Sequence, residues 1–277
     1  MSTEGQPQIV LATRPERALS QRFADKVALV TGASDRGIGG AIAERLAAEG
    51  AAISMISRHE PDRLMQRLRE NSAAALFTTG DVARTEDVAH VVETTIDRFG
   101  QIDVLVNNAG IELAEPLATL SDEQWTELLQ VNLTGVLRMS RAVLEHMDSR
   151  GGAIVNIASV LGLAGSAGLA AYSATKAGVI GMTQSLALEL APKGIRVVAV
   201  APAMVKTPMA TRYAPNMTAE VWERIQQSHP LGIGRPADVA AAVAFLASDE
   251  ARWITGITLP MGWTPAFPLP VDDMLGR

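Results

Sequence analysis

Tyr172 and Lys176 stand four residues apart in the segment YSATK, which opens a helical pattern. In a helix this spacing places both side chains on one face. A phenol with a reference pKa of ~10 is a poor proton donor or base at neutral pH, but a neighbouring ammonium favours the phenolate and lowers that pKa. The pair could therefore exchange a proton with a carbonyl or alcohol oxygen. The spacing alone is weak evidence, because any helix can carry Tyr and Lys four residues apart.

Ser159 strengthens the case through its position in the chain. It closes the apolar run AIVNIAS (153–159), which is typical of a buried strand, shortly before Tyr172. Open α/β sheets bind their ligands at the carboxyl ends of the strands. A serine at a strand end and a tyrosine at a helix start therefore predict a catalytic site.

A glycine-rich turn, TGASDRGIGG (31–40), joins the first apolar run to the first helical pattern. Gly32, Gly37 and Gly39 would allow a tight turn and a close approach of the backbone to a pyrophosphate, which the helix N-terminus would bind. A tight turn also needs glycines for steric reasons alone. Its place at the first strand-to-helix junction favours nucleotide binding.

The choice of nucleotide depends on the end of the second predicted strand, where an acidic residue normally binds the ribose 2′-hydroxyl of NAD. Here the strand ends in Ser57, followed by Arg58, and Arg36 lies inside the glycine turn. Two arginines without a carboxylate favour a 2′-phosphate, so we expect NADP(H) to be preferred, with NAD(H) possible. The alternative is that both arginines are ordinary solvated side chains.

The elements that must position these residues alternate between strand and helix along the chain. Apolar strand runs are predicted at 26–31, 51–57, 74–79, 102–110, 153–159, 195–202 and 256–260, and helices at 37–50, 61–71, 85–98, 121–148, 172–191 and 236–248. The strands are continuously apolar, as expected of parallel strands buried on both faces. This pattern predicts an α/β fold: a single-domain, doubly wound parallel sheet (Rossmann fold) of about seven strands with helices on both faces.

The predicted domain covers residues 23–263, preceded by an N-terminal arm (1–22) and followed by a C-terminal tail (264–277). The longest stretch without a clear pattern is 203–219, a connection of the kind that often serves as a lid. Its residues Met204, Met209, Tyr213 and Met217 either wall an adaptable apolar pocket or fill the loop.

Composition excludes several classes of protein. The 277 residues carry 24 basic and 30 acidic side chains, and a net charge of −6 argues against a nucleic-acid-binding surface. The absence of cysteine rules out disulfides, thiolate metal sites and cysteine nucleophiles. No apolar run reaches the ~18 residues of a membrane helix, so a cytoplasmic protein is expected. The four histidines show no ligand spacing, and no metal site is predicted.

Taken together, the motifs resemble those of the short-chain dehydrogenase/reductase family over about 24–263. Within it the chain is most similar to bacterial 3-oxoacyl-(acyl-carrier-protein) reductases and to related sugar or alcohol dehydrogenases. The matching segments, in the family's order, are TGASDRGIG (31–39), Asp81-Val82, NNAG (107–110), VNLTG (131–135), NIAS (156–159), YSATK (172–176), APAMVKT (201–207) and GRPADVA (234–240).

This resemblance implies a role for each matching residue. Tyr172 would be the general acid in reduction, Lys176 would lower its pKa and bind the nicotinamide ribose, and Ser159 would orient the substrate oxygen. Asn132 would hold a water that links Lys176 to solvent. The implied cofactor-binding residues are Gly32, Ser34, Arg36, Gly37, Ile38, Gly39, Ser57, Arg58, Asp81, Val82, Asn108, Ala109, Gly110, Tyr172, Lys176, Pro202, Val205 and Thr207.

Three departures from the family pattern stand out. The glycine turn has one residue more than usual between Gly32 and Gly37, which puts the aim of Arg36 in doubt. Val198 and Ala203 replace the usual Asn and Gly of the segment around 198–203. The chain reads LPMGW (259–263) where the family's VDGG, often at subunit contacts, is expected.

The implied activity is an NADP(H)-dependent interconversion of a carbonyl and a secondary alcohol. The substrate is a 3-oxoacyl thioester on an acyl carrier protein or, alternatively, a sugar or small alcohol. An acidic carrier protein would need a basic patch, for which Arg138, Arg141 and Arg150 are candidates. A homotetramer or dimer is expected, packed through the helices at 121–148 and 172–191. The alternative of another class, a non-catalytic nucleotide-binding protein, predicts loss of Tyr172, Lys176 or Ser159, and all three are present.

Overall fold

The computed structural model of the chain describes residues 21–147, 151–212 and 218–262. Most of the predicted arm, the predicted tail, and Arg150, Tyr213 and Met217 lie outside the described residues.

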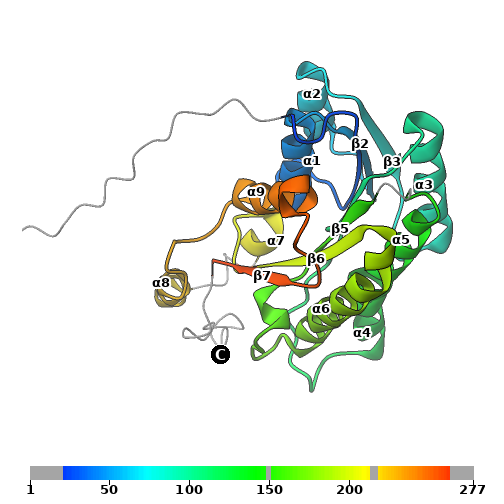
Figure 1. The fold of residues 1–277 in the computed structure, drawn as a ribbon. Coiled ribbons are helices and arrows are strands. Elements are labelled where there is room, and N and C mark those ends of the chain that lie inside the picture. The colour runs from blue at the N-terminus through cyan, green and yellow to red at the C-terminus, as the bar shows by residue number, and fades with distance from the viewer. Residues whose placement is uncertain (1–20, 148–150, 213–217, 263–277) are drawn as a thin grey trace, which may run out of the picture.

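Seven parallel strands form one sheet in the order β3-β2-β1-β4-β5-β6-β7 (Figure 1). Their bounds are β1 Val27–Thr31, β2 Ala52–Ser57, β3 Ala75–Thr79, β4 Val104–Asn107, β5 Gly152–Ile157, β6 Ile195–Pro202 and β7 Thr258–Met261. The strand order reverses between β1 and β4, which is where a doubly wound sheet opens its binding crevice. The predicted fold class is confirmed.

Helices cover both faces of this sheet (Figure 1). Alternate residues of one strand serve opposite faces: Val30 packs into the core beneath α1, α2 and α9, whereas Leu29 packs beneath α3, α5 and α6. The α-helices are α1 Ile38–Ala48, α2 Asp62–Glu70, α3 Thr85–Phe99, α4 Asp122–Leu129, α5 Gly135–Leu144, α6 Ala170–Leu190, α7 Pro208–Thr211, α8 Ala219–Gln227 and α9 Pro236–Ala247. Within the described ranges, none of the helices combines the length and the apolar character needed to cross a membrane.

The prediction of one long helix at 121–148 is wrong in one respect, because the helix is interrupted. Ser121 and Gln124 form a capping box that starts α4, but a π-helical turn, η1 (Gln130–Thr134), separates α4 from α5, and α5 ends at Leu144. Asn132 within this turn is fully buried and hydrogen-bonds the backbone of Ile111. The wide turn thus directs a polar side chain into the interior, and π-turns are frequent at functional sites.

Two predicted strands end earlier than expected. The run at 102–110 leaves the sheet after Asn107, and the run at 153–159 leaves it after Ile157. Beyond Asn107, the backbone N–H groups of Asn108 and Ala109 turn to the side chain of Thr31 instead of a neighbouring strand. Ser159 therefore lies two residues past β5 and caps a short 3₁₀ turn, η2 (Val160–Gly162).

The connection at 203–219, expected to lack regular structure, contains the short helix α7. Thr207 caps it by accepting a hydrogen bond from the backbone N–H of Ala210 at 3.3 Å, and Pro208 occupies the first helical position. Both features are standard helix-start signals, although neither made α7 apparent in the sequence.

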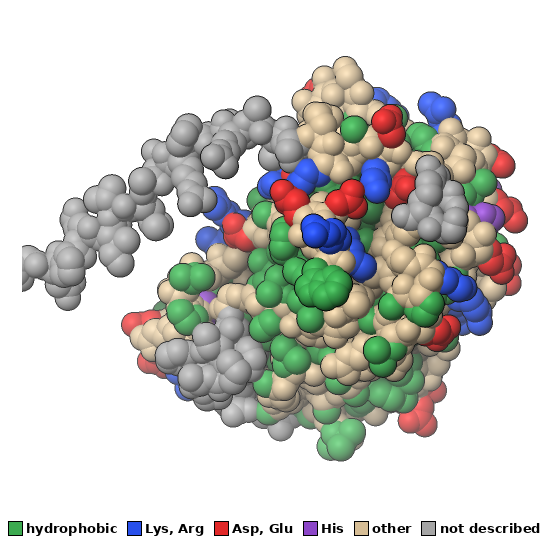
Figure 2. Space-filling view, viewed as in Figure 1, with side chains coloured by type: hydrophobic (Ala, Val, Ile, Leu, Met, Phe, Trp, Pro, Cys, Tyr) green, Lys and Arg blue, Asp and Glu red, His purple; other side chains and the backbone are tan. Residues whose placement is uncertain are grey.

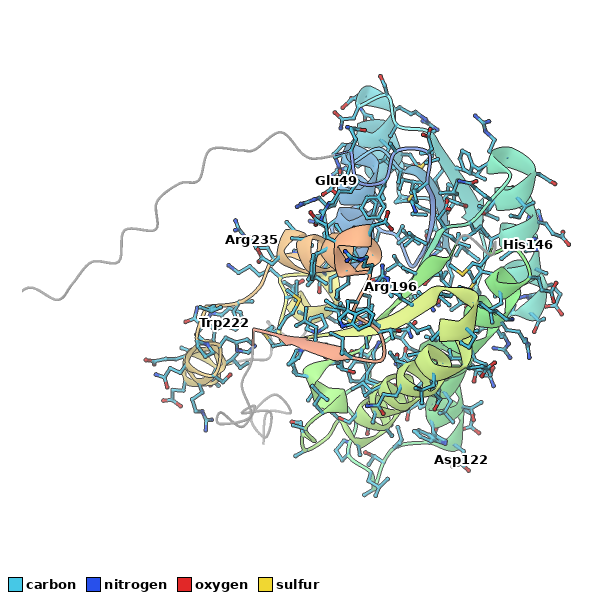
Figure 3. The ribbon with its side chains drawn as sticks, viewed as in Figure 1. Glu49, Asp122, His146, Arg196, Trp222 and Arg235 are labelled. Carbon is cyan, nitrogen blue, oxygen red and sulfur yellow. The ribbon has the colours of Figure 1, made fainter. Side chains whose placement is uncertain are left out.

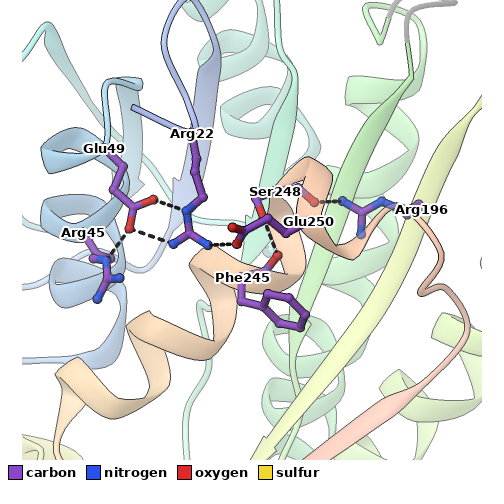
Figure 4. Close-up of polar contacts among 7 residues, drawn as sticks. All are labelled: Arg22, Arg45, Glu49, Arg196, Phe245, Ser248 and Glu250. Carbon is purple, nitrogen blue, oxygen red and sulfur yellow. Dashed lines mark hydrogen bonds and ion pairs between the residues drawn. The ribbon is translucent and has the colours of Figure 1, made fainter. Parts of the chain in front are cut away.

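Charged side chains fasten the start of the domain to α1 and to the 3₁₀ turn η5 (Asp249–Ala251) (Figures 3 and 4). Glu49, 1% exposed, receives hydrogen bonds from Arg22 at 2.6 Å and Arg45 at 2.5 Å, and Arg22 also pairs with Glu250 at 2.6 Å. Burial alone would raise the pKa of Glu49, but the two arginines outweigh it and hold the pKa below its usual range. Arg22, the last residue of the expected arm, is thus tied to the domain.

We expect Arg22→Ala to lower the free energy of unfolding by about 2 kcal/mol at neutral pH, because Glu49 stays buried with one cation fewer. Since the folded-state pKa of Glu49 is depressed, this stabilisation is present above the unfolded-state pKa and is lost as the pH falls through the folded value. Urea denaturation at neutral and acidic pH measures both effects. The exposed Arg252→Ala serves as control, and equal stability of Arg22→Ala and the unchanged chain at neutral pH would contradict the expectation.

Candidate active site

A cleft of about 520 Å³ opens at the carboxyl ends of the strands, beside the point where the strand order reverses. It brings together most of the residues singled out from the sequence: Gly32, Ser34, Gly37, Ile38, Ser57, Arg58, Asp81, Val82, Asn108, Ala109, Gly110, Ser159, Tyr172, Lys176, Pro202, Val205 and Thr207. Arg36, Gly39 and Asn132 do not line it.

The glycine turn and the NNAG segment form one structure at the floor of this cleft. Gly32 has a φ of +69°, and a Cβ there would lie 2.6 Å from the Cα of Ala109, so the position requires glycine. The Asn108 amide donates to the carbonyls of Thr31 at 2.9 Å and Gly32 at 3.0 Å. Gly39 packs against the same amide, where a side chain would collide with it. Asn108 and Gly39 therefore support the turn.

The turn fits the phosphates of a dinucleotide. It leads into α1, whose N-cap residue is Gly37, without a side-chain cap and without an acidic residue in the first turn. The first backbone N–H groups of α1 are thus left to a ligand, and the positive end of the helix dipole favours an anion. Gly32 and Gly37 both line the cleft, and the lack of a side chain at these positions allows a pyrophosphate to approach the backbone.

Asp35, one of the four residues between Gly32 and Gly37, stabilises the turn. Its carboxylate accepts a hydrogen bond from the backbone N–H of Leu64 at 2.9 Å, in the first turn of α2, where Pro61 offers no side-chain cap. Arg67 donates to the Asp35 carbonyl at 3.1 Å. Arg36 and Arg63 line a hollow that adjoins the main cleft and shares Ser34 and Pro208 with it. Arg36 thus lies beside the cleft, and its side chain is not part of the lining of the main cleft.

The end of β2 presents a different cation to the cleft. The Ser57 hydroxyl donates to the His59 carbonyl at 2.6 Å, and Arg58 between them is exposed at the cleft rim. On the same side, the Asp81 carboxylate accepts from the backbone N–H of Ala83 at 2.9 Å. No carboxylate occupies the end of β2 itself, so an anionic group there would meet Arg58.

Tyr172 and Lys176 lie on the first turns of α6, as their spacing predicts, and both are buried. The Lys176 ammonium is 5.7 Å from the centre of the Tyr172 ring and donates to the Ile157 carbonyl at 2.9 Å. Burial lowers the pKa of Lys176 to about 8, and the charge of Glu112 opposes that shift. A lysine that is held beside a phenol and has its pKa lowered by burial suits proton exchange.

Ser159 and Asn132 complete the surroundings of this pair. Ser159 faces the cleft and is 8% exposed, and its hydroxyl accepts from the backbone N–H of Leu161 at 3.2 Å. The Asn132 side chain lies behind the cleft wall, where it accepts from Ile111 N at 2.8 Å and donates to the Thr175 hydroxyl at 3.2 Å. Since its amide is engaged on both atoms, any water bound at Asn132 would be held by the main chain.

The sequence did not single out His229 or Glu112 as residues of the cleft. His229 is buried and lines the cleft, and its Nε2 accepts from the backbone N–H of Met204 at 3.1 Å. Glu112, directly after the NNAG-Ile run, lines the cleft near Lys176. A lone His and a lone Glu carry no spacing signal, so the fold alone reveals them. Among the described residues, no group of three or more acidic or histidine side chains could hold a metal ion.

Comparison with known proteins agrees with this geometry. The family model described as short chain dehydrogenase matches residues 26–218. The chain is 42% identical over 241 residues to the 3-oxoacyl-[acyl-carrier-protein] reductase FabG of Escherichia coli, covering 86% of this chain and 96% of the relative. It is 41% identical over 245 residues to the cis-4-hydroxycyclohexanecarboxylate dehydrogenase of Sinomonas cyclohexanicum. This match covers 87% of this chain and 96% of the relative.

Solved structures show the same likeness. A single-substitution variant of the actinorhodin polyketide ketoreductase, solved with NADPH, superposes with a TM-score of 0.81 and is 38% identical, covering 88% of this chain and 97% of that one. A dehydrogenase/reductase from Sinorhizobium meliloti 1021 gives a TM-score of 0.79 at 32% identity, covering 87% and 95%. The chain therefore belongs to the short-chain dehydrogenase family, and it is an NAD(P)-dependent oxidoreductase that acts on carbonyl and alcohol groups.

Proposed function

We propose that this enzyme uses NADPH to reduce 3-oxoacyl thioesters to 3-hydroxyacyl thioesters. The observation that carries the proposal is the buried Tyr172–Lys176 pair, which shares one cleft with Ser159 and with the glycine turn of a dinucleotide site. The similarity to 3-oxoacyl-[acyl-carrier-protein] reductases over most of both chains supports the substrate class.

Each residue of the pair has a distinct task in this proposal. The cofactor, when bound, supplies hydride to the carbonyl carbon. Tyr172 donates its phenolic proton to the carbonyl oxygen, which Ser159 holds by a hydrogen bond. Lys176 stabilises the phenolate that is left, and a water at the main chain of Asn132 resupplies the proton. The close approach of Asn132 and Lys176 across Gly110 supports this route, since a Cβ at Gly110 would lie 3.4 Å from the Asn132 Oδ1 and 3.5 Å from the Lys176 Nζ.

This assignment predicts the pH dependence of the reaction. Since burial lowers the pKa of Lys176 to about 8, the ammonium that favours the phenolate is present below that pH and is lost above it. We expect kcat/KM for reduction to fall as the pH rises through about 8. In Lys176→Met this decline should disappear, and the activity below it should drop to roughly a tenth or less.

Initial rates of NADPH consumption across a range of pH measure this effect. Lys193→Met, which removes an exposed cation of the same type, should behave as the unchanged enzyme. A folded Lys176→Met variant with the original profile would contradict the coupling between lysine and tyrosine.

Two candidate substrates follow from the relatives. The cleft lining includes Met204, Met209 and Leu161, which could accommodate an acyl chain and favour the thioester. A sugar or small alcohol is the second candidate, supported by the similarity to a hydroxycyclohexanecarboxylate dehydrogenase. A panel of acetoacetyl thioesters, sugars and cyclic alcohols, with the absorbance of NADPH or NADP⁺ turnover as readout, tests the choice. Faster turnover of a sugar or cyclic alcohol would overturn the thioester proposal.

An acyl carrier protein as partner has less support from the surface. Of the three arginines considered for docking it, Arg138 is partly buried and donates to the Gln130 side chain at 2.9 Å, whereas Arg141 is exposed. Arg150 lies outside the described residues. The thioester carried by a small soluble pantetheine analogue is therefore the substrate of choice for the first assays.

We further propose a homotetramer or dimer built through α5 and α6. Leu137 on α5 is 44% exposed and Leu188 on α6 is 81% exposed, and neighbouring helices of this kind suit an isologous interface. Figure 2 shows hydrophobic side chains on the face that presents α9 and β7. Three exposed large apolar residues belong to this part of the chain: Phe245 on α9, Trp253, and Ile257 just before β7.

Light scattering at micromolar concentration should give a dimer or tetramer. Leu188→Arg should convert a tetramer into dimers, or a dimer into monomers. In a two-fold symmetric contact each of the two copies would bury one new charge, so the substitution destabilises the contact twice. Arg252→Ala, an exposed change elsewhere, should leave it intact. A monomeric unchanged chain would refute the proposed assembly.

A further inference from the structure

Glu112 occupies a place that the proposed reaction does not explain. Its neighbours Ile111 and Leu113 pack with Leu128 and Tyr172 in an apolar cluster on one wall of the cleft. Glu112 between them lines the cleft. An acidic side chain is thus set into an apolar wall, next to the residues that would exchange the proton.

The surroundings of the Glu112 carboxylate explain how it can act on a ligand. Burial raises its pKa, while the charges of Arg212, at the end of α7, and of Lys176 act in the opposite direction. The carboxylate thus lies in the cleft between an apolar wall and two cations. A carboxylate in such a wall is costly, so a ligand that supplies a donor is favoured and a ligand that brings a second negative charge is disfavoured.

The charges of Asp81 and Arg58 lie in a different part of the cleft from the charge of Glu112. Asp81 and Arg58 line the part of the cleft next to the end of β2 and the segment after β3, away from the Tyr172 wall. Of the acidic residues that line the described cleft, Glu112 is thus the one whose charge acts on Lys176. A substrate that reaches Tyr172 therefore meets this charge.

We propose that Glu112 is a specificity-determining residue of the substrate site, which rejects free 3-oxo acids and admits their neutral esters and thioesters. The inference rests on the proposed function and narrows its substrate class. A carboxylate next to the reacting carbonyl would share the cleft with the Glu112 charge beside an apolar wall, where repulsion is screened less than in bulk water. An ester or thioester of the same length lacks that charge.

A matched pair of small substrates tests this selection: acetoacetate and ethyl acetoacetate, which differ in charge at one end. We expect the unchanged enzyme to reduce the ester with a kcat/KM at least about tenfold above that of the acid. In Glu112→Gln, which keeps the size and removes the charge, kcat/KM for the acid should rise about tenfold, whereas the value for the ester should change by less than about threefold.

Three control variants separate charge selection from other effects. Glu112→Asp keeps the charge and should keep the preference for the ester. Glu127→Gln, an exposed position on α4, removes the same charge at the surface and should leave both substrates unaffected. Arg212→Gln tests whether Glu112 serves only to hold α7. Each variant should have the same thermal midpoint as the unchanged enzyme, both without NADPH and with it. This control shows that folding and cofactor binding are intact.

The outcomes distinguish this inference from the proposed function. If the ester is reduced but Glu112→Gln leaves the ratio of ester to acid unchanged, charge selection is wrong while the proposed activity stands. If Glu112→Gln and Arg212→Gln weaken both substrates equally, Glu112 acts only as an ion-pair partner of α7, and the inference is overturned. If the unchanged enzyme reduces neither the ester nor an acetoacetyl thioester, the proposed function and the inference fail together.

Discussion

Replacing Tyr172 with Phe should lower kcat for carbonyl reduction by roughly 10²–10⁴-fold, the contribution expected of a positioned general acid. The substitution removes one oxygen and leaves the ring, which is 8% exposed and packs in the apolar cluster with Leu128 and Leu169. The fold and the cofactor site should therefore remain intact, so that the loss appears in kcat. Steady-state rates with a ketone, together with NADPH binding followed by fluorescence, measure the two effects separately.

Ser185→Ala is the matched control for this change. It also removes a single hydroxyl from α6, but at an exposed position whose hydroxyl donates to the Gly181 carbonyl at 3.2 Å. Its activity should equal that of the unchanged enzyme. If Tyr172→Phe keeps more than about a tenth of the activity, Tyr172 is not the acid.

The second large effect concerns the cofactor. We expect NADPH to be preferred over NADH by at least tenfold in kcat/KM, because Arg58 at the cleft rim follows β2 directly and could bind the 2′-phosphate by charged hydrogen bonds. Such bonds are worth roughly 1.5–3 kcal/mol each, which corresponds to about 10–150-fold. Arg58→Ala should remove most of the preference, and Ser57→Asp should reverse it by repelling the phosphate and accepting the ribose hydroxyls of NAD.

Arg36→Ala is the informative comparison, because Arg36 lines a hollow that adjoins the main cleft, whereas Arg58 lines the main cleft itself. It should change the preference less than Arg58→Ala does. Binding of 2′-phosphorylated and unphosphorylated AMP, measured by calorimetry, provides a readout that does not depend on turnover. Equal efficiency with both cofactors, or a preference for NADH, in the unchanged enzyme would contradict the assignment.

Much of the fold follows from the sequence because the strands are buried on both faces. Apart from Arg196, the run at 195–202 is apolar and rich in β-branched residues, and β6 has the same bounds. The Tyr172–Lys176 pair was predictable for a similar local reason, since a helix fixes the relation of residues four apart. Features that are determined within one short segment or one motif could therefore be predicted from the sequence.

Features that depend on distant contacts could not be predicted. The π-turn around Asn132 is held by bonds to Ile111 and Thr175, which are far away in the chain. Asp35 turns to α2, and the neighbouring Arg36 lines a hollow that adjoins the main cleft. Glu112 and His229 become residues of the cleft only when several distant segments of the chain meet at the sheet edge. In each case tertiary packing determines the position of a polar side chain, and local sequence patterns do not predict such contacts.

NADPH consumption by the purified enzyme with an acetoacetyl thioester, measured beside Tyr172→Phe, tests the proposed reaction most directly. We expect saturable consumption of NADPH, one 3-hydroxyacyl thioester formed for each NADPH oxidised, and a loss of at least about 100-fold in the variant. If the enzyme binds NADPH but oxidises it with no thioester, ketone or sugar of the panel, the proposed reaction is wrong.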